Sequence, residues 1–239
     1  MDPEDEQLFN EIINDLYQKD SNCAYNGTDY DLDLQGSSSS HYDNASRPFF
    51  SYFNEDLLER PTYKTFLALM DNYVAGTGES ENLNYEEVKE NIDFIEAICE
   101  TSLMQDFYEK ILEHELYEKH DDEDEFTYNN LKQHLYITWF KLYSRNYQSQ
   151  REGILDSSAF EHTFVGETKN SASGNGTPMG FHNWLRLYQL ESSGELNYRV
   201  VLGRWFFDVF FDTSRCPDAQ DHPSTKATSK KPTETSWPK

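Results

Sequence analysis

Apolar residues recur at helical spacing through the first 145 positions, and this pattern limits the possible folds more than any other feature of the chain. One apolar stripe runs from Tyr63 to Val74. A second stripe begins at Val88, and the helical pattern continues to about residue 119. The pattern therefore predicts an all-helical N-terminal lobe over residues 1–145.

Several helix starts can be read from single residues. Pro61 suits the first turn of a helix, because its missing N–H would have no partner there. Asn84 and Glu87 have the spacing of a capping box, with Asn in place of Ser or Thr. Further helices are expected over residues 4–18 and 130–144, with a surface loop over 20–46 and an acidic loop over 120–125.

The pattern changes after Arg145. Residues 146–157 are irregular, and Phe160, His162 and Phe164 then alternate with their neighbours as in a strand. This segment is expected to be extended, with its aromatic face and His162 against the core.

The residues that follow are expected to complete a β-rich lobe. They comprise a flexible Gly/Ser/Asn loop over 168–180, a helix from near His182 to Ser192, strands around 195–202 and at 205–211, and a disordered tail over 212–239. The predicted fold class is therefore α+β, with the helical lobe over 1–145 followed by a β-rich lobe over 146–211.

Charge is distributed unevenly along the chain. The formal net charge is −24, and residues 1–130 hold 33 acidic and 7 basic side chains. Residues 131–198 hold 6 of each kind. Because neutralisation of phosphate drives most nucleic-acid binding, broad electrostatic capture of RNA is not expected. A small and specific RNA site in the second half is compatible with this balance.

The cellular location is predicted from features that the sequence lacks. No run approaches the roughly 18 apolar residues of a membrane span. The acidic N-terminus differs from a signal peptide, and the widely spaced Cys23, Cys99 and Cys216 are expected to be reduced thiols. A cytoplasmic or nuclear protein is expected, or a secreted one if a leader precedes this sequence.

Two histidines, His162 and His182, are the main candidates for chemistry. Cleavage of RNA needs one group that takes the proton of the 2′-hydroxyl and another that protonates the departing 5′-oxygen, and imidazoles titrate near neutral pH. A single histidine among aromatic residues is more often a hydrogen-bonded structural residue. Both interpretations of each histidine are open at this point.

Glu161 and Glu167 flank the first histidine. Either carboxylate could orient a histidine, and together they could ligate a hard divalent ion such as Mn²⁺. Alternatively, both are ordinary exposed carboxylates at the end of a strand. The chain has no HExxH, GxSxG, P-loop or GxGxxG motif, which removes the common hydrolase and nucleotide-binding classes.

Five blocks together resemble one known family. They read, in order, ERPTYKTFLALMDNY, LYITWFKLYSR, DSSAFEHTFVGE, GFHNWLRLYQLE and GELNY. The chain is identified on these blocks as resembling the eukaryotic EndoU (XendoU-type) family of uridylate-specific endoribonucleases, which includes placental protein 11. The resemblance covers about residues 7–198.

The resemblance implies a two-lobed α+β fold and Mn²⁺-stimulated cleavage of single-stranded, U-containing RNA. The products would be a 2′,3′-cyclic phosphate and a 5′-hydroxyl. On the matching positions, His162 and His182 would be the general acid–base pair, without individual roles. Glu161 and Glu167 match acidic positions linked to activity and metal dependence. A monomer is expected.

The chain departs from the family after Tyr198. The family has a catalytic lysine and a uridine-reading segment there, and neither is recognisable in residues 199–239. The expected β-rich lobe is therefore truncated or replaced. Two functions follow: an EndoU-type endoribonuclease of weak or absent activity, or a catalytically inactive truncated isoform that acts as a binding or regulatory protein.

Overall fold

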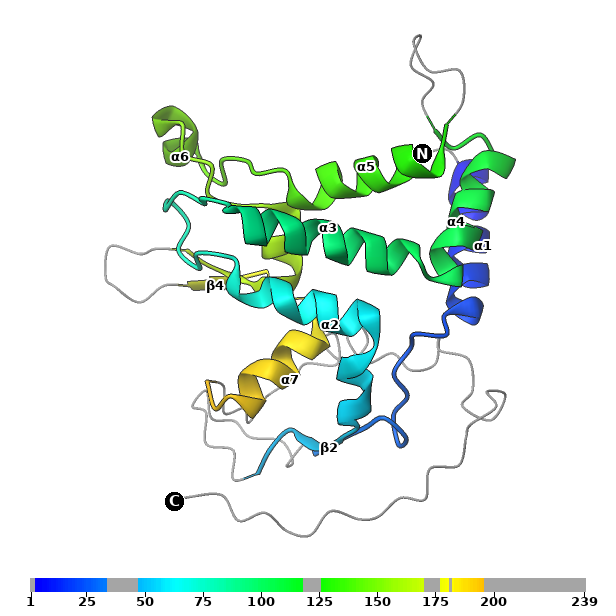
Figure 1. Ribbon diagram of the computed structural model, residues 1–239, viewed down its shortest axis with the longest axis horizontal. Coiled ribbons are helices and arrows are strands. Elements are labelled where there is room, and N and C mark those ends of the chain that lie inside the picture. The colour runs from blue at the N-terminus through cyan, green and yellow to red at the C-terminus, as the bar shows by residue number, and fades with distance from the viewer. Residues whose placement is uncertain (1–2, 34–46, 118–125, 170–176, 181, 196–239) are drawn as a thin grey trace.

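The computed structural model describes residues 3–33, 47–117, 126–169, 177–180 and 182–195. Helix α3 (Tyr85–Cys99) packs between α2 (Pro61–Ala68) and α5 (Tyr128–Phe140), as Figure 1 shows. At one end of this layer, α1 (Pro3–Lys19) packs against α4 (Ser102–Glu113). These helices form the frame on which the later elements are placed.

The remaining elements are short. Strands β1 (Tyr30–Leu32) and β2 (Phe50–Phe53) form one antiparallel pair, and β3 (Glu167–Lys169) and β4 (Thr177–Met179) form another. The other elements are the 3₁₀-helices η1 (Glu55–Glu59) and η2 (Leu69–Asp71), α6 (Tyr147–Glu152), a π-helix (Glu161–Val165) and α7 (Trp184–Ser192). Mostly helical with few strands, the described structure is consistent with the predicted α+β class.

The helix starts predicted from single residues are confirmed. Pro61 is the first residue of α2. The Asn84 side chain accepts the N–H groups of Glu86 and Glu87, while the Glu87 carboxylate accepts the N–H of Asn84 at 2.8 Å, which completes the capping box. The helix expected over 4–18 is α1.

Some predicted helices end earlier than expected. Helix α4 ends at Glu113, and α5 ends at Phe140 rather than near residue 144. After α5 the backbone becomes extended, and the N–H of Tyr143 donates to the carbonyl of Ser157 at 2.9 Å. The chain therefore leaves the helix to pair with a later segment.

The prediction of an all-helical N-terminal lobe is wrong, because the β1–β2 pair lies within it. Tyr30 is paired with Phe53 in this hairpin, and β1 falls inside the expected surface loop over 20–46. Tyr30 and Phe50 are buried against Leu187 of α7. The aromatic residues of the hairpin thus have a tertiary partner far away in the sequence.

Three predictions for the second half are also corrected. The irregular segment 146–157 contains α6, which is capped by Asn146 and ends at Gly153. The expected strand at Phe160–Phe164 is a π-helix, because residues four apart share a helix face, and these two rings lie 5.0 Å apart in the core. The expected loop over 168–180 includes strand residues of the β3–β4 pair.

One apolar cluster joins the two predicted lobes. Phe160 has no exposed surface and packs on Phe66, with 5.7 Å between ring centroids. The buried members of the cluster are Phe66, Leu69, Met70, Ile95, Cys99, Phe140, Phe160, Val165 and Leu185. Because they come from both sides of residue 145, the helical layer anchors the π-helix and α7. The division into lobes at residue 145 stays a prediction.

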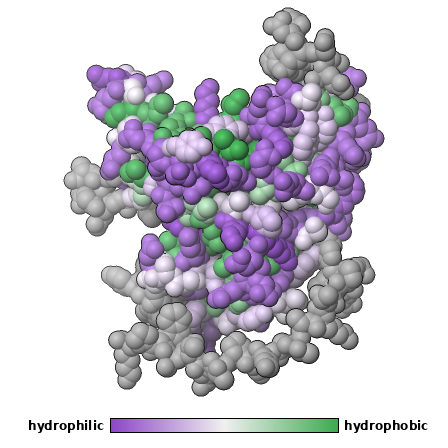
Figure 2. Space-filling model, viewed as in Figure 1, coloured by the Kyte–Doolittle hydropathy of each residue, from purple (hydrophilic) through white to green (hydrophobic). Residues whose placement is uncertain are grey.

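The cysteine prediction is wrong in one position and the C-terminal predictions are untested. Cys99 is a buried free thiol, whereas Cys23 is disulfide-bonded. The strand at 205–211 and the tail over 212–239 lie outside the described residues, as does nearly all of the strand around 195–202. Within the described part of the chain, no helix has the length and apolar character to cross a bilayer. Hydrophilic residues cover most of the face seen in Figure 2.

Candidate active site

The π-helix places two consecutive residues in opposite surroundings. Its wide turn is closed by the N–H of Gly166, which donates to the carbonyl of Glu161 at 2.9 Å. Glu161 has no exposed surface, whereas 28% of the His162 side chain is exposed. Single turns of π-helix are frequent at functional sites. Here the turn presents His162 at the surface while Glu161 enters the interior.

Glu167 holds the imidazole of His162. The Glu167 Oε2 atom lies 2.7 Å from His162 Nδ1. Glu167 is the first residue of β3, where it pairs with Met179 of β4. The preceding residue, Gly166, connects the π-helix to this strand and has a φ of 93°. With Glu167 as a carboxylate, Nδ1 donates this hydrogen bond and Nε2 carries the lone pair.

Arg145 is a site residue that the sequence did not reveal. Its Nε lies 3.2 Å from Glu167 Oε2, and its Nη2 lies 2.9 Å from Nδ1 and 3.1 Å from Nε2 of His162. The residue belongs to the LYITWFKLYSR block, but nothing in that block indicates a contact with residues 17 and 22 positions later. The guanidinium brings a permanent positive charge to the reactive face of His162.

Buried polar groups fix Arg145 and Glu167. The Asp156 carboxylate accepts the N–H of Arg145 at 2.7 Å, the N–H of Gly78 at 2.6 Å and the hydroxyl of Ser149 at 2.6 Å. Burial opposes its ionisation, but these hydrogen bonds lower the pKa of Asp156 below its ordinary value. The hydroxyl of Ser157 donates to the Glu167 oxygen that His162 leaves free.

His182 lies opposite His162. Its N–H donates to the carbonyl of Thr163 at 2.6 Å, which ties the residue to the π-helix. The imidazole centroids of the two histidines are 6.5 Å apart, with 72° between the ring planes. His182 is exposed and directly precedes Asn183, whose side chain caps α7. The structure therefore brings both candidate histidines together.

Gly180 makes this approach possible. A Cβ atom at this position would lie 1.8 Å from the backbone oxygen of His162 and 2.8 Å from its carbonyl carbon. The φ of Gly180 is 70°, which also disfavours a side chain. Only glycine lets the segment between β4 and α7 pass this close to His162. The position of Gly180 in the GFHNW motif, two residues before His182, was the sequence feature that could have indicated this role.

Glu161 has no comparable partners. Neither of its carboxyl oxygens has a hydrogen-bond partner among the described residues, and its side chain is fully buried. Burial, followed by the nearby charges of Glu81 and Glu167, raises the pKa of Glu161 to about 9. Glu161 is therefore a neutral carboxylic acid at physiological pH. It is not the exposed strand-end carboxylate that one interpretation of the sequence described.

The two glutamates do not fit the Mn²⁺ site that the sequence suggested. Both oxygens of Glu167 are engaged by Ser157, Arg145 and His162, and Glu161 is a buried neutral acid. Across the described residues, no group of three or more His, Cys, Asp or Glu side chains could hold a metal ion. The structure supports the orienting role of Glu167 instead.

Comparison with known proteins assigns the family. The family model described as "Endoribonuclease XendoU" matches residues 9–204. The chain belongs to this family. This match confirms the resemblance found over about residues 7–198. The His162–His182 pair therefore lies in a chain whose relatives are EndoU endoribonucleases.

Relatives within the family share about a third of the residues. "Uridylate-specific endoribonuclease B" of Danio rerio is 36% identical over 202 residues, covering 82% of this chain and 66% of the relative. "Poly(U)-specific endoribonuclease-A" of Xenopus laevis is 36% identical over 204 residues, covering 82% and 65%.

A solved structure supports the fold. "The structure of XendoU: a splicing independent snoRNA processing endoribonuclease" matches with a TM-score of 0.62 and 34% identity, covering 82% of this chain and 65% of that one. The chain thus spans slightly less than two thirds of these relatives.

Proposed function

We propose that this chain carries the histidine pair of a uridylate-specific endoribonuclease and acts on single-stranded RNA. The observation that supports this most directly is the pairing of His162 and His182, with 6.5 Å between ring centroids. Two hydrogen bonds of about 3 Å that end on oxygens of one phosphate span roughly this distance. The names of the relatives supply the uridylate preference.

The proposed reaction is an internal transfer of the phosphodiester. One histidine takes the proton of the 2′-hydroxyl, and the 2′-oxygen attacks the phosphorus atom. The other histidine gives a proton to the 5′-oxygen as the bond between that oxygen and phosphorus breaks. The products are a 2′,3′-cyclic phosphate and a 5′-hydroxyl, and no water or redox partner is consumed.

Glu167 and Arg145 would support this chemistry in different ways. Glu167 fixes His162 in the tautomer whose Nε2 accepts a proton. Arg145 lies 3.1 Å from that nitrogen, where its charge can neutralise the phosphate between the two rings. A local cation of this kind suits a chain that is strongly acidic elsewhere.

Weak turnover is expected from this chain compared with its relatives. The cation bonded to His162 in the described structure is a guanidinium that already bridges to Glu167, and residues 199–239 contain no recognisable counterpart of the family's catalytic lysine segment. If turnover is absent and RNA binding persists, the alternative function, an inactive binding or regulatory isoform, applies.

The test uses a single-stranded oligonucleotide with one uridine, and a matched oligonucleotide with 2′-deoxyuridine at that position. We expect slow cleavage at the uridine, none at the deoxyuridine, and at least about a hundredfold loss in His162→Ala and in His182→Ala. His134→Ala, which changes an exposed histidine of α5, is the control and should retain activity. Cleavage that survives both active-site substitutions would exclude the proposed pair.

A further inference from the structure

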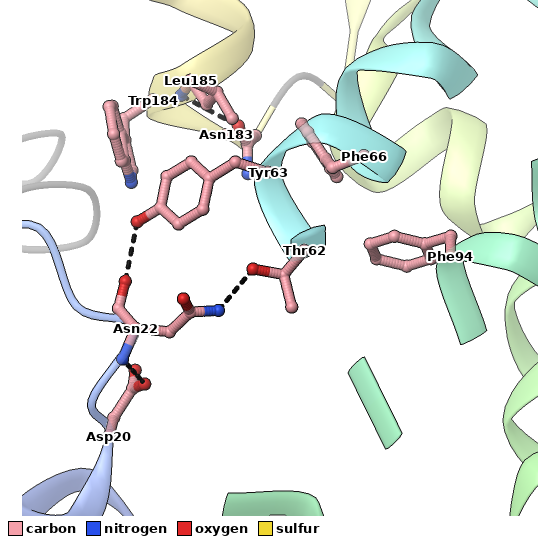
Figure 3. A pocket seen from close by; sticks show the side chains of 9 residues that line it. All are labelled: Asp20, Asn22, Thr62, Tyr63, Phe66, Phe94, Asn183, Trp184 and Leu185. Carbon is pink, nitrogen blue, oxygen red and sulfur yellow. Dashed lines mark hydrogen bonds between the residues drawn. The ribbon is translucent and has the colours of Figure 1, made fainter. Parts of the chain in front are cut away.

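A concave site begins at the residues that directly follow His182. It has a volume of about 250 Å³ and is formed by the segment after α1, the first turns of α2, one side chain of α3 and the start of α7. Figure 3 shows its two kinds of lining. The aromatic rings are those of Tyr63, Phe66, Phe94 and Trp184, and the polar groups include those of Asp20, Asn22, Thr62 and Asn183.

The aromatic lining is only partly covered by the protein. Tyr63, Phe94 and Trp184 are all half-buried, unlike the fully buried rings of the core. The centroids of Tyr63 and Trp184 are 6.2 Å apart, with 62° between the ring planes. Their remaining surface faces a small pocket, below the roughly 300–1,000 Å³ of sites for drug-sized ligands. A single flat ring fits these dimensions.

The polar lining is held in place by internal hydrogen bonds. The N–H of Asn22 donates to Asp20 Oδ1 at 2.8 Å, and its side-chain amide donates to the hydroxyl of Thr62. The hydroxyl of Tyr63 donates to the Asn22 carbonyl at 2.8 Å. Asp20 forms no ion pair with any other residue that the structure describes. Its carboxylate can only accept, so a ligand here must offer a donor.

The position of the pocket relates it to the candidate active site. Asn183 and Trp184 line the pocket and directly follow His182 in the chain. Consecutive Cα atoms are about 3.8 Å apart, so the rim of the pocket begins one residue from this histidine. The charge of Asp20 would repel a phosphate, which leaves the uncharged base as the part of an RNA chain that can enter.

We propose that this pocket binds a nucleobase of single-stranded RNA, at a nucleotide next to the one that is cleaved. The base stacks against the aromatic lining and donates an N–H, such as that of uracil N3, to the Asp20 carboxylate. Splayed bases of single-stranded RNA are commonly held by this combination of stacking and edge contacts. The proposal rests on the proposed function for RNA as the ligand, and it adds a base-binding subsite outside the histidine pair.

The test measures nucleoside binding to the full chain by ligand-observed NMR, without RNA cleavage. Uridine should bind at least about fivefold more tightly than 3-methyluridine, which lacks the N3–H donor. Dihydrouridine, whose ring is not aromatic, should also bind more weakly. Asp20→Asn should abolish the preference for uridine over 3-methyluridine, while Asp56→Asn, which removes an exposed carboxylate from η1, should preserve it.

A second substitution protects the test from misfolding. Thr62→Val keeps the shape of the lining but removes the hydroxyl that positions Asn22, and it should weaken uridine binding in a chain whose circular dichroism is unchanged. Equal affinity for uridine and 3-methyluridine, or uridine binding that is unaffected in Asp20→Asn, would overturn the proposal. Nucleosides are not cleaved, so this binding test is independent of cleavage. A chain that does not cleave RNA but still binds uridine through Asp20 would contradict the proposed function and support the base-binding subsite.

Discussion

The two sides of the π-helix differ in whether their ionisable side chains have hydrogen-bond partners. On the outer side, His162 Nδ1 donates to the buried Glu167 carboxylate, and the Arg145 guanidinium contacts His162 Nε2 and Glu167. On the core side, Glu161 is fully buried, and no residue in the described part of the chain hydrogen-bonds to its carboxyl oxygens. A glutamate near His162 therefore has no fixed role, because Glu167 orients the imidazole whereas Glu161 is held as a neutral acid.

The difference follows from the geometry of the turn. A π-helix inserts an extra residue into a helical turn, which rotates neighbours away from the usual spacing. Ser158 accepts the N–H of Glu161 through its hydroxyl at 3.0 Å, so the backbone of this residue is satisfied while its carboxyl is not. Disrupting the turn should therefore affect both sides at once, whereas changing one glutamate should act mainly on its own side.

The largest effect is expected from Gly180→Ala. The new Cβ would collide with the backbone of His162 and would occupy a positive φ, so the segment that carries His182 must move away. The free energy of unfolding should fall by about 3 kcal/mol or more, with loss of any uridine-specific cleavage. Denaturant unfolding and the oligonucleotide assay measure the two effects.

Gly153→Ala is the matched control for this substitution. Gly153 has a φ of 69°, almost that of Gly180, but no atom lies within 4 Å of the position of its Cβ. The loss of unfolding free energy in Gly153→Ala should therefore be limited to the backbone strain of about 1 kcal/mol. Equal losses of stability in the two variants would show that the contact with His162 is not what requires glycine at Gly180.

A smaller effect is expected from Glu167→Gln, which removes the carboxylate that holds His162. The amide keeps one acceptor oxygen but loses the charge that pairs with Arg145. Its hydrogen bond to His162 Nδ1 is also weaker than that of the carboxylate. Stability should fall by about 2–3 kcal/mol, because the guanidinium loses its partner. Cleavage should fall further than in Arg145→Ala if the orientation of His162 is the main contribution of Glu167. Unchanged cleavage would contradict that role.

The sequence predicted the features that depend on local chemistry. The capping box at Asn84 and the helix start at Pro61 involve residues within one turn of each other, and both are present. The pairing of His162 with His182 rested on the family resemblance together with the chemistry of RNA cleavage. None of these needed knowledge of distant contacts.

The features that were missed depend on tertiary contacts. The alternation of Phe160, His162 and Phe164 is compatible with a strand, and only packing against Phe66 selects the π-helix. Arg145 reaches His162 because Asp156 holds its backbone, and no periodicity in the sequence encodes that bond. Gly180 owes its role to an approach between two segments that are 18 positions apart.

The smallest effect at mildly acidic pH is expected from Glu161→Gln, on the core side of the π-helix. The pKa of Glu161 is about 9 in the folded chain against 4.5 for an unperturbed glutamate, so between these values the folded state holds a proton that the unfolded state has lost. Stability therefore falls as the pH rises through this window, by at most about 1.4 kcal/mol per pH unit. Glutamine cannot ionise, so this dependence should disappear in the variant.

The comparison of unfolding free energies at several pH values makes the prediction specific. Near the lower end of the window the variant should match the wild type or be slightly less stable, because a buried amide also lacks partners. Towards pH 9 the variant should become progressively more stable than the wild type, by at most about 1.4 kcal/mol for each pH unit crossed. A difference between wild type and Glu161→Gln that is constant across the window would mean that Glu161 is ionised in the folded protein, and the contrast between the two sides of the π-helix would be lost.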